Sequence, residues 1–307
     1  MRPVLLLCFS SLVTACSSLN MVNAPSQNHN SRVNYLVIHF TSEHFAESLR
    51  LLTQPTDNPV SAHYLIPETD DDTYDRHALR VHKLVPESRR AWHAGVSSWH
   101  GEESLNDRSI GIELVNRSYC TDIDPDIETP APENQSCIFH DFSAEQFALL
   151  VRLTREIIER FPEIDPVDVV GHSDIAPDRK VDPGPRFPWR QLYEQGIGAW
   201  YDEETVDRYR EQFQHGPPDI ALIQRALLAY GYRIDETGEN DPQTRFVVRA
   251  FQMHFRPSDY SGRIDQETSA ILFALIEKYR PEAKLDASEQ QSANQATPPR
   301  NHFLETA

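Results

Sequence analysis

Basic side chains are scarce in this chain of 307 residues, where 29 lysines and arginines stand against 47 aspartates and glutamates and the formal net charge is -18. A nucleic-acid-binding protein needs a basic surface, and adsorption to anionic lipid needs a polybasic patch, so the charge argues against both. The N-terminal apolar run, Val4 to Val13, is too short to span a bilayer as a helix. With Arg2 before it, this run is typical of a signal sequence.

Cysteine is also scarce, with four in the chain, and one of them closes the apolar run. Val13-Thr14-Ala15-Cys16 resembles a bacterial lipobox, which implies cleavage before Cys16 and acylation of its thiol. Ser17 rather than aspartate follows, which points to the outer membrane of a Gram-negative bacterium, facing the periplasm. We therefore expect a lipoprotein signal peptide over 1–15 and a lipidated, flexible tether over 16–31. The alternative is an ordinary secretory signal with an incidental cysteine.

After processing, Cys120 and Cys137 remain, at the two ends of a segment rich in proline and acidic residues. Export places them in an oxidising compartment, where disulfides persist. A disulfide between them is one reading, and two unpaired thiols are the other.

Strand and helix patterns interleave over residues 32–200. Short apolar, β-branched segments predict strands at 34–40, 62–66, 80–85, 109–115 and 167–170. Helical spacing predicts helices at 42–53 and 143–161, the second with a capping box formed by Ser143 and Gln146. We expect an α/β domain, a mixed central β-sheet with helices packed on it.

Residues 201–283 carry helical patterns only. The spacing Gly-x-x-Asp-x-x-Thr occurs at Gly238 and again at Gly262, each time before an apolar helical stretch. Glycine would permit the turn and aspartate would cap the helix, so we infer an internal duplication within a small all-α, three-helix domain. The tail over 284–307 lacks periodicity and is expected to be disordered.

Two histidines and one aspartate are candidate metal ligands. His39 ends the first predicted strand, His172 follows the last one, and Asp182 lies ten residues later in a proline-rich, non-helical stretch. Two imidazoles and one carboxylate are the ligand count of a catalytic zinc site, which keeps a fourth position for water. The alternative is a pair of strand-end histidines with ordinary partners and an aspartate in a turn.

Glu113 lies in the middle of a predicted strand, and a buried carboxylate there should be either paired or functional. Gly111 on the same face leaves room for another group to approach closely. An ion pair or an exposed strand face would also explain Glu113. Lys180 projects to the same side as Asp182 and could stabilise a developing oxyanion.

Four segments resemble the zinc-dependent N-acetylmuramoyl-L-alanine amidases, the family that includes phage lysozyme-like amidases and peptidoglycan recognition proteins. They are VIHFT (37–41), AWHAG (91–95), LNDRSIGIE (105–113) and GHSDIAPDRKVDPG (171–184), in the family's order. The lipobox and helical C-terminal domain also resemble outer-membrane members. The resemblance implies one Zn²⁺ held by His39, His172 and Asp182.

The same resemblance implies hydrolysis of the muramoyl–L-alanine amide bond of peptidoglycan or muropeptides by a zinc-activated water, for cell-wall turnover. Glu113 is then the catalytic acid and base, and Lys180 stabilises the oxyanion. Trp92 and His93 are expected to line the substrate groove, unless they serve packing alone, and Arg179 is a candidate to contact a peptide carboxylate.

The duplicated units also resemble a three-helix peptidoglycan-binding domain; a structural cap that binds nothing is the alternative. We expect a monomer with no nucleic-acid partner. Two other functions stay open at this point. One is a non-catalytic peptidoglycan receptor, which the complete ligand set disfavours. The other is a zinc peptidase acting within the stem peptide, which the absence of a His-Glu-x-x-His pair disfavours.

Overall fold

The computed structural model describes residues 21–127 and 131–285. The expected signal peptide, Cys16 and nearly all of the expected tail lie outside the described residues. Residues 21–30 belong to a unit separate from Ser31–Ala307 and contain no helix or strand. In the described part of the chain, no helix combines the length and apolar character needed to cross a membrane.

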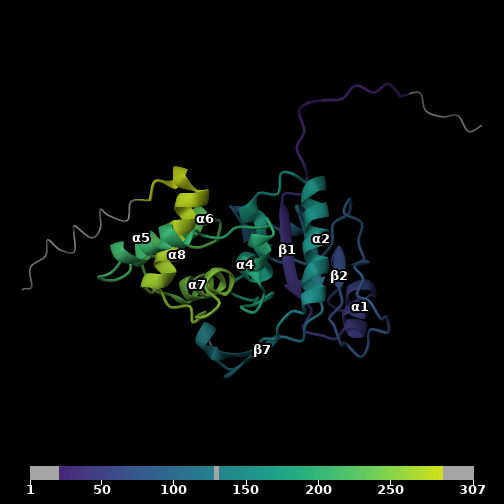
Figure 1. The fold of residues 1–307 in the computed structure, drawn as a ribbon, viewed down its shortest axis with the longest axis horizontal. Coiled ribbons are helices and arrows are strands. Elements are labelled where there is room, and N and C mark those ends of the chain that lie inside the picture. Colours follow the sequence, from purple (N-terminus) through teal and green to yellow (C-terminus); the bar gives the residue numbers. More distant parts are fainter. Residues whose placement is uncertain (1–20, 128–130, 286–307) are drawn as a thin grey trace, which may run out of the picture. The chain divides into compact units, whose positions relative to one another are not determined.

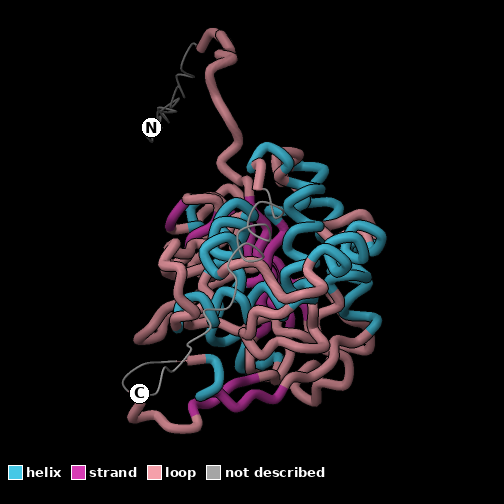
Figure 2. The backbone as a smooth tube through the Cα atoms, turned by 90° about the vertical axis from the view of Figure 1, so that its left-hand side faces the viewer, coloured by secondary structure: helices cyan, strands magenta, loops and turns pink. Residues whose placement is uncertain are grey.

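A five-stranded sheet organises the N-terminal half of the fold, with the order β3-β2-β6-β1-β9. The strands are β1 (Tyr35–Phe40), β2 (Tyr64–Ile66), β3 (His82–Lys83), β6 (Ser109–Leu114) and β9 (Val169–Gly171). All neighbours pair in parallel except β2 and β3, so the sheet is mixed, as expected. Figure 2 shows these strands running between layers of helix and loop.

Helices cover both faces of this sheet. Helix α2 (Ala144–Arg160) packs Leu150, Val151 and Ile157 into the main core, together with Leu36 and Ile112 of the strands. Figure 1 shows α2 running alongside β1. Helix α1 (Phe45–Thr53) contributes to a second, smaller core with Leu65, whose side chain points to the opposite face. The predicted α1 began at 42; the helix starts later because His44 caps it, accepting from the Glu47 amide.

Only half of the expected capping box forms at the start of α2. The Ser143 hydroxyl accepts from the Gln146 amide, as predicted. The Gln146 side chain does not return to Ser143; its Nε2 donates to the carbonyls of Ile66 (3.2 Å) and Val115 (2.9 Å). The Ile66 carbonyl also accepts from the Val115 amide at 2.9 Å, so the glutamine is a second donor there. The buried Val115 carbonyl has no such backbone donor within residues 21–127 and 131–285, and the glutamine supplies the hydrogen bond that it needs.

Two short hairpins extend from this core. One pairs β4 (Ser98–Trp99) with β5 (Glu102–Glu103), and the other pairs β7 (Tyr119–Asp122) with β8 (Gln135–Ile138). Cys120 and Cys137 are direct cross-strand partners in the second hairpin, with Cα atoms 4.1 Å apart and sulfur atoms at bonding distance.

The C-terminal half is helical, as Figure 1 shows. It follows α3 (His172–Ile175) and α4 (Trp189–Glu194) and comprises α5 (Glu203–Gln212), α6 (Ile220–Tyr230), α7 (Pro242–Phe255) and α8 (Gln266–Tyr279). The three predicted helices are α6, α7 and α8, and α5 packs against α8 in addition.

The predicted duplication is visible in matching hydrogen bonds. Gln224 accepts from the Gly238 amide and donates to Thr244, while Gln252 accepts from the Gly262 amide and donates to Thr268. Both glycines have positive φ, +71° and +77°, as the predicted turns require. Asp241 and Asp265 cap α7 and α8 by accepting from the threonine amides. Each copy is therefore one turn-helix unit fixed by a buried glutamine.

The sheet and the helical region share one hydrophobic core. Trp99 is 1% exposed, and its ring packs edge-on against Tyr232, with centroids 4.8 Å apart. The same cluster of buried side chains extends from the strands to α6, α7 and α8.

Candidate active site

The candidate site lies at the carboxyl ends of the parallel strands, where sites of α/β sheets gather. His39 and Glu113 are register partners on β1 and β6, so their side chains emerge on the same face. His172 follows β9 as the first residue of α3, and Asp182 lies in the turn ten residues later. The topology thus brings three distant segments to one edge.

Three side-chain atoms form a nearly equilateral triangle. The Nδ1 atoms of His39 and His172 are 3.0 Å apart, and Oδ2 of Asp182 lies 3.0 Å from the first and 3.1 Å from the second. All three residues are buried, and their ligand atoms form the one cluster of this kind among the described residues that could hold a metal ion. The sequence-based grouping of these residues therefore matches the arrangement in space.

The surroundings of the triangle favour a neutral His39 ring and an ionised Asp182 carboxylate. Burial, together with the nearby His172, lowers the pKa of His39 to about 4. Burial alone would raise the pKa of Asp182, but His172 and His39 outweigh it and hold that pKa well below its usual range. Metals bind neutral imidazole and ionised carboxylate, so these are the protonation states that a metal needs.

The hydrogen bonds behind the triangle determine which nitrogen of each ring carries the proton. Nε2 of His172 lies 3.1 Å from the carbonyl oxygen of Ala94, which can only accept, so His172 is protonated at Nε2. Its Nδ1 lone pair is then free to face the centre of the triangle.

The tautomer of His39 follows from a longer chain of hydrogen bonds. Ser109 Oγ donates to the Leu105 carbonyl at 2.6 Å, so it accepts from Nε2 of His93 at 3.1 Å. Burial lowers the pKa of His93 well below its usual value, which keeps this ring neutral and makes its Nδ1 an acceptor. His39 Nε2 therefore donates to His93 across 3.0 Å, and its Nδ1 lone pair also points into the triangle.

The structure places His93 behind His39, 7% exposed, where its ring contacts this candidate metal ligand. Its backbone amide and that of Ala94 both donate to Asn106 Oδ1, which fixes the segment. The His93 ring can lie this close to strand β6 because Gly111 has no side chain: a Cβ there would be 2.4 Å from the ring. The sequence reasoning expected space beside Gly111 but missed Ser109, Asn106 and the Ala94 carbonyl.

Glu113 is the register partner of His39, and the charge of Lys180 acts on both of these residues. Burial, then the charge of Asp182, raises the pKa of Glu113 well above its usual value, and Lys180 opposes this shift. Glu113 Oε2 is buried and has no hydrogen-bond partner among the residues that the structure describes. An acid with a raised pKa and a free oxygen is suited to proton transfer near neutral pH. The ion pair considered as an alternative for Glu113 is not found among them.

Trp92 and Arg179 lie in the surroundings of the site. The Trp92 side chain is 51% exposed. The Arg179 guanidinium donates to the carbonyls of Ala94 (2.6 Å) and Val96, so it braces the loop that carries the His172 acceptor.

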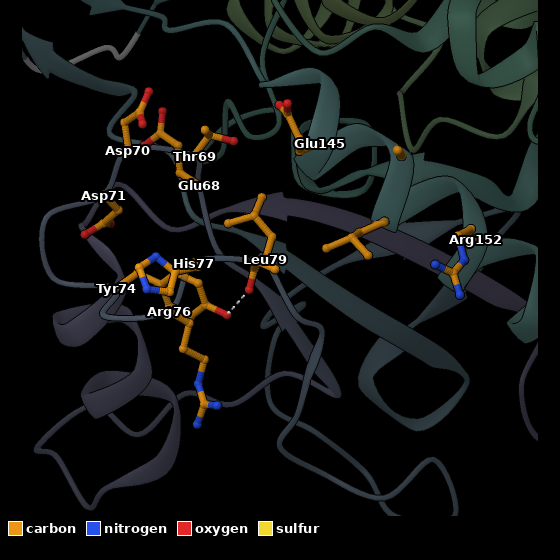
Figure 3. Close-up of a pocket in the computed structure, with 13 residues that line it drawn as sticks. Glu68, Thr69, Asp70, Asp71, Tyr74, Arg76, His77, Leu79, Glu145 and Arg152 are labelled. Carbon is orange, nitrogen blue, oxygen red and sulfur yellow. Dashed lines mark hydrogen bonds between the residues drawn. The ribbon is translucent and has the colours of Figure 1, made fainter.

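A pocket of about 660 Å³ lies elsewhere, between the loop after β2 and the N-terminal half of α2. Figure 3 shows Asp70 and Asp71 on that loop and Glu145 on the helix. The pocket shares no residue with the triangle, and an acidic lining by itself identifies no ligand.

Comparison with known proteins defines the class of this fold and site. Residues 29–185 match the family model described as N-acetylmuramoyl-L-alanine amidase, and residues 216–272 match a putative peptidoglycan binding domain. The chain belongs to the N-acetylmuramoyl-L-alanine amidase family, and the expected enzyme class is confirmed.

Individual relatives cover most of the chain. It is 44% identical over 249 residues to N-acetylmuramoyl-L-alanine amidase AmiD of Escherichia coli K12, covering 81% of this chain and 84% of that one. AmpDh3 from Pseudomonas aeruginosa, solved with an anhydromuramic pentapeptide, aligns with a TM-score of 0.76 at 44% identity, covering 85% and 99% of the two chains. E. coli AmiD, solved with anhydro-N-acetylmuramic acid-L-Ala-D-gamma-Glu-L-Lys, aligns with a TM-score of 0.69 at 41% identity. The alignment covers 83% of this chain and 93% of that one.

Proposed function

We propose that this chain hydrolyses the amide bond between N-acetylmuramic acid and L-alanine in peptidoglycan and its fragments, using one Zn²⁺ held by His39, His172 and Asp182. The triangle of two imidazole nitrogens and one carboxylate oxygen, with both lone pairs facing inward, carries this proposal. Anhydromuramic peptides occupy two solved relatives, so we include 1,6-anhydro fragments among the proposed substrates.

The residues fit a zinc ion. Tetrahedral zinc with bonds of about 2.0–2.2 Å to nitrogen and oxygen has ligand atoms roughly 3.3 Å apart. The three atoms of the triangle are 3.0 to 3.1 Å apart. Both histidines also use their second nitrogen for a hydrogen bond, as metal-binding histidines do. When bound, zinc would supply Lewis-acid polarisation of the scissile carbonyl and a water nucleophile at neutral pH.

Glu113 is the proposed acid and base. Its free Oε2 accepts the proton of the attacking water and delivers it to the nitrogen of L-alanine as the amide bond breaks. Lys180, whose charge is felt at both Glu113 and His39, is the proposed partner of the negative oxygen that develops on the carbonyl.

We assign substrate contacts to the surroundings of the triangle. The exposed Trp92 ring is suited to pack against the substrate, and Arg179 is the proposed contact for a peptide carboxylate. For His93, its hydrogen bond to His39 supports a role in orienting that ring. The catalytic part is proposed to span 32–200 and a helical, peptidoglycan-binding part 201–283; the family match over 216–272 supports the second assignment.

The location is proposed from the N-terminal sequence. The lipobox ending at Cys16 supports a lipid anchor in the outer membrane, with the enzyme in the periplasm. The facing Cys120 and Cys137 support a disulfide, since that compartment is oxidising. Intact mass would test both: the mature protein should carry acyl chains on Cys16, and no thiol should be alkylated without reductant.

The activity is tested by digesting purified peptidoglycan with a form of the protein that starts after Cys16. We expect free stem peptides beginning with L-alanine, loss of release with a chelator, and recovery on adding Zn²⁺. His172→Ala should release nothing and bind no zinc. Fragments cut within the stem would indicate a peptidase instead, and a zinc-loaded protein that releases nothing would indicate a receptor.

A further inference from the structure

Asp174 is a buried carboxylate two residues after the ligand His172, and the proposed mechanism does not use it. It is 1% exposed, and both of its oxygens accept hydrogen bonds. Oδ2 accepts from the Gly171 amide at 2.7 Å and from Nδ1 of His254 at 2.8 Å. Oδ1 accepts from the Tyr232 hydroxyl at 2.7 Å.

Two of these three donors come from the helical region. Tyr232 lies just after α6, and His254 lies in the last turn of α7. Aromatic packing holds each in place: Tyr232 packs against Trp99, and the His254 ring stacks on Trp189 with centroids 3.7 Å apart. Aromatic packing therefore fixes the two donors independently of their hydrogen bonds to Asp174.

Helix α3, which carries Asp174, spans four residues, His172–Ile175. One turn of helix is not stable by itself, so tertiary contacts must hold it. Its first residue is the ligand His172, and its second, Ser173, donates its amide to the Asp182 carbonyl at 2.8 Å. The position of α3 thus sets the position of one ligand directly and of a second through one hydrogen bond.

We propose that Tyr232 and His254 are positioning residues for the metal site, because their hydrogen bonds to Asp174 anchor α3 and with it His172 and Asp182. The helical region then completes the catalytic centre in addition to any binding of peptidoglycan. This inference rests on the proposed function, in which His172 and Asp182 hold the zinc.

The test is Tyr232→Phe in the full chain, with Tyr230→Phe as matched control. The control removes a hydroxyl from a neighbouring buried tyrosine that also packs against Trp99 but does not hydrogen-bond to Asp174. Partners of metal ligands typically change metal affinity or activity by about 10–100-fold. Tyr232 contacts Asp174 and not a ligand itself, so a somewhat smaller effect is expected. Tyr232→Phe should weaken zinc binding by about 5–20-fold in chelator competition, lower kcat and leave KM unchanged.

Two further measurements separate positioning from general stability. In the metal-free protein, amide exchange over residues 171–182 should be faster in Tyr232→Phe than in Tyr230→Phe. His254→Asn keeps a donor near the position of Nδ1 and should retain zinc affinity. His254→Phe keeps the ring that stacks on Trp189 but has no donor for Asp174, so it should bind zinc more weakly. This second pair decides the question if Tyr232→Phe does not fold.

Equal zinc affinity and equal exchange in the two tyrosine variants would overturn the inference, as would equal zinc affinity in the two His254 variants. The proposed function would survive that result, provided that His172→Ala still abolishes zinc binding and release of stem peptides.

Discussion

Gly111→Ala tests the hydrogen-bond chain that orients His39. The new Cβ would lie 2.4 Å from Cγ of His93 and 2.6 Å from its Nδ1, the atom that accepts from His39. Carbon atoms in contact need about 3.5–4.0 Å, so the ring must retreat by about 1 Å. The bond to His39, now 3.0 Å, would stretch to about 4 Å and break.

The expected result is zinc affinity about 10–100-fold weaker, the usual effect of losing a partner of a metal ligand. Overpacking should also lower the free energy of unfolding by about 1–3 kcal/mol. Ile110→Val is the control, because it trims a fully buried neighbour on the opposite sheet face at a cost of about 0.5–1.5 kcal/mol. Chelator competition and urea unfolding measure both quantities. A Gly111→Ala protein that binds zinc as tightly as Ile110→Val would refute the role given to His93.

Three more outcomes follow from the structure. Glu113→Gln should lower kcat by about 10²–10⁴-fold while zinc content stays at one per chain, and near-normal turnover would remove Glu113 from the mechanism. Gln146→Leu should lower the free energy of unfolding by about 1–3 kcal/mol, because the buried Val115 carbonyl loses its donor and the Ile66 carbonyl keeps only the Val115 amide; an unchanged urea midpoint would contradict this. The metal-free protein should lose stability as pH falls from about 6.5 toward 4, because only the unfolded chain protonates His39 in that window. A urea midpoint that stays constant over that range would show that the folded protein protonates His39 as readily.

Much of the catalytic half could be predicted because its signals are local or periodic. Strand β1 and strand β6 are continuous apolar segments, and parallel strands bring their carboxyl ends to one edge, where the register makes His39 and Glu113 neighbours. The helix caps at Asp241 and Asp265 are equally local, since each aspartate bonds an amide three residues away. Such features need no knowledge of the rest of the chain.

The supporting contacts could not be predicted, because each joins residues whose spacing carries no pattern. Ser109 meets His93 only once the segment 91–95 has folded over β6, and Asp174 meets His254 across 80 residues. Gln146 shows the same limit: its position predicted a hydrogen bond to Ser143, but its side chain donates instead to the buried carbonyls of Ile66 and Val115. Burial decides these partners, and burial is a property of the assembled fold.

The continuity of the core bears on how any binding role of the helical region can be tested. Trp99 of the catalytic half is 1% exposed and packs against both Tyr230 and Tyr232. A fragment ending near residue 200 would expose that ring and leave Asp174 without two of its donors, so lost activity in the fragment would not show lost binding to peptidoglycan. Substitutions on the solvent-exposed face of the helical region, made in the full chain, separate the two effects because they leave both the core and α3 intact.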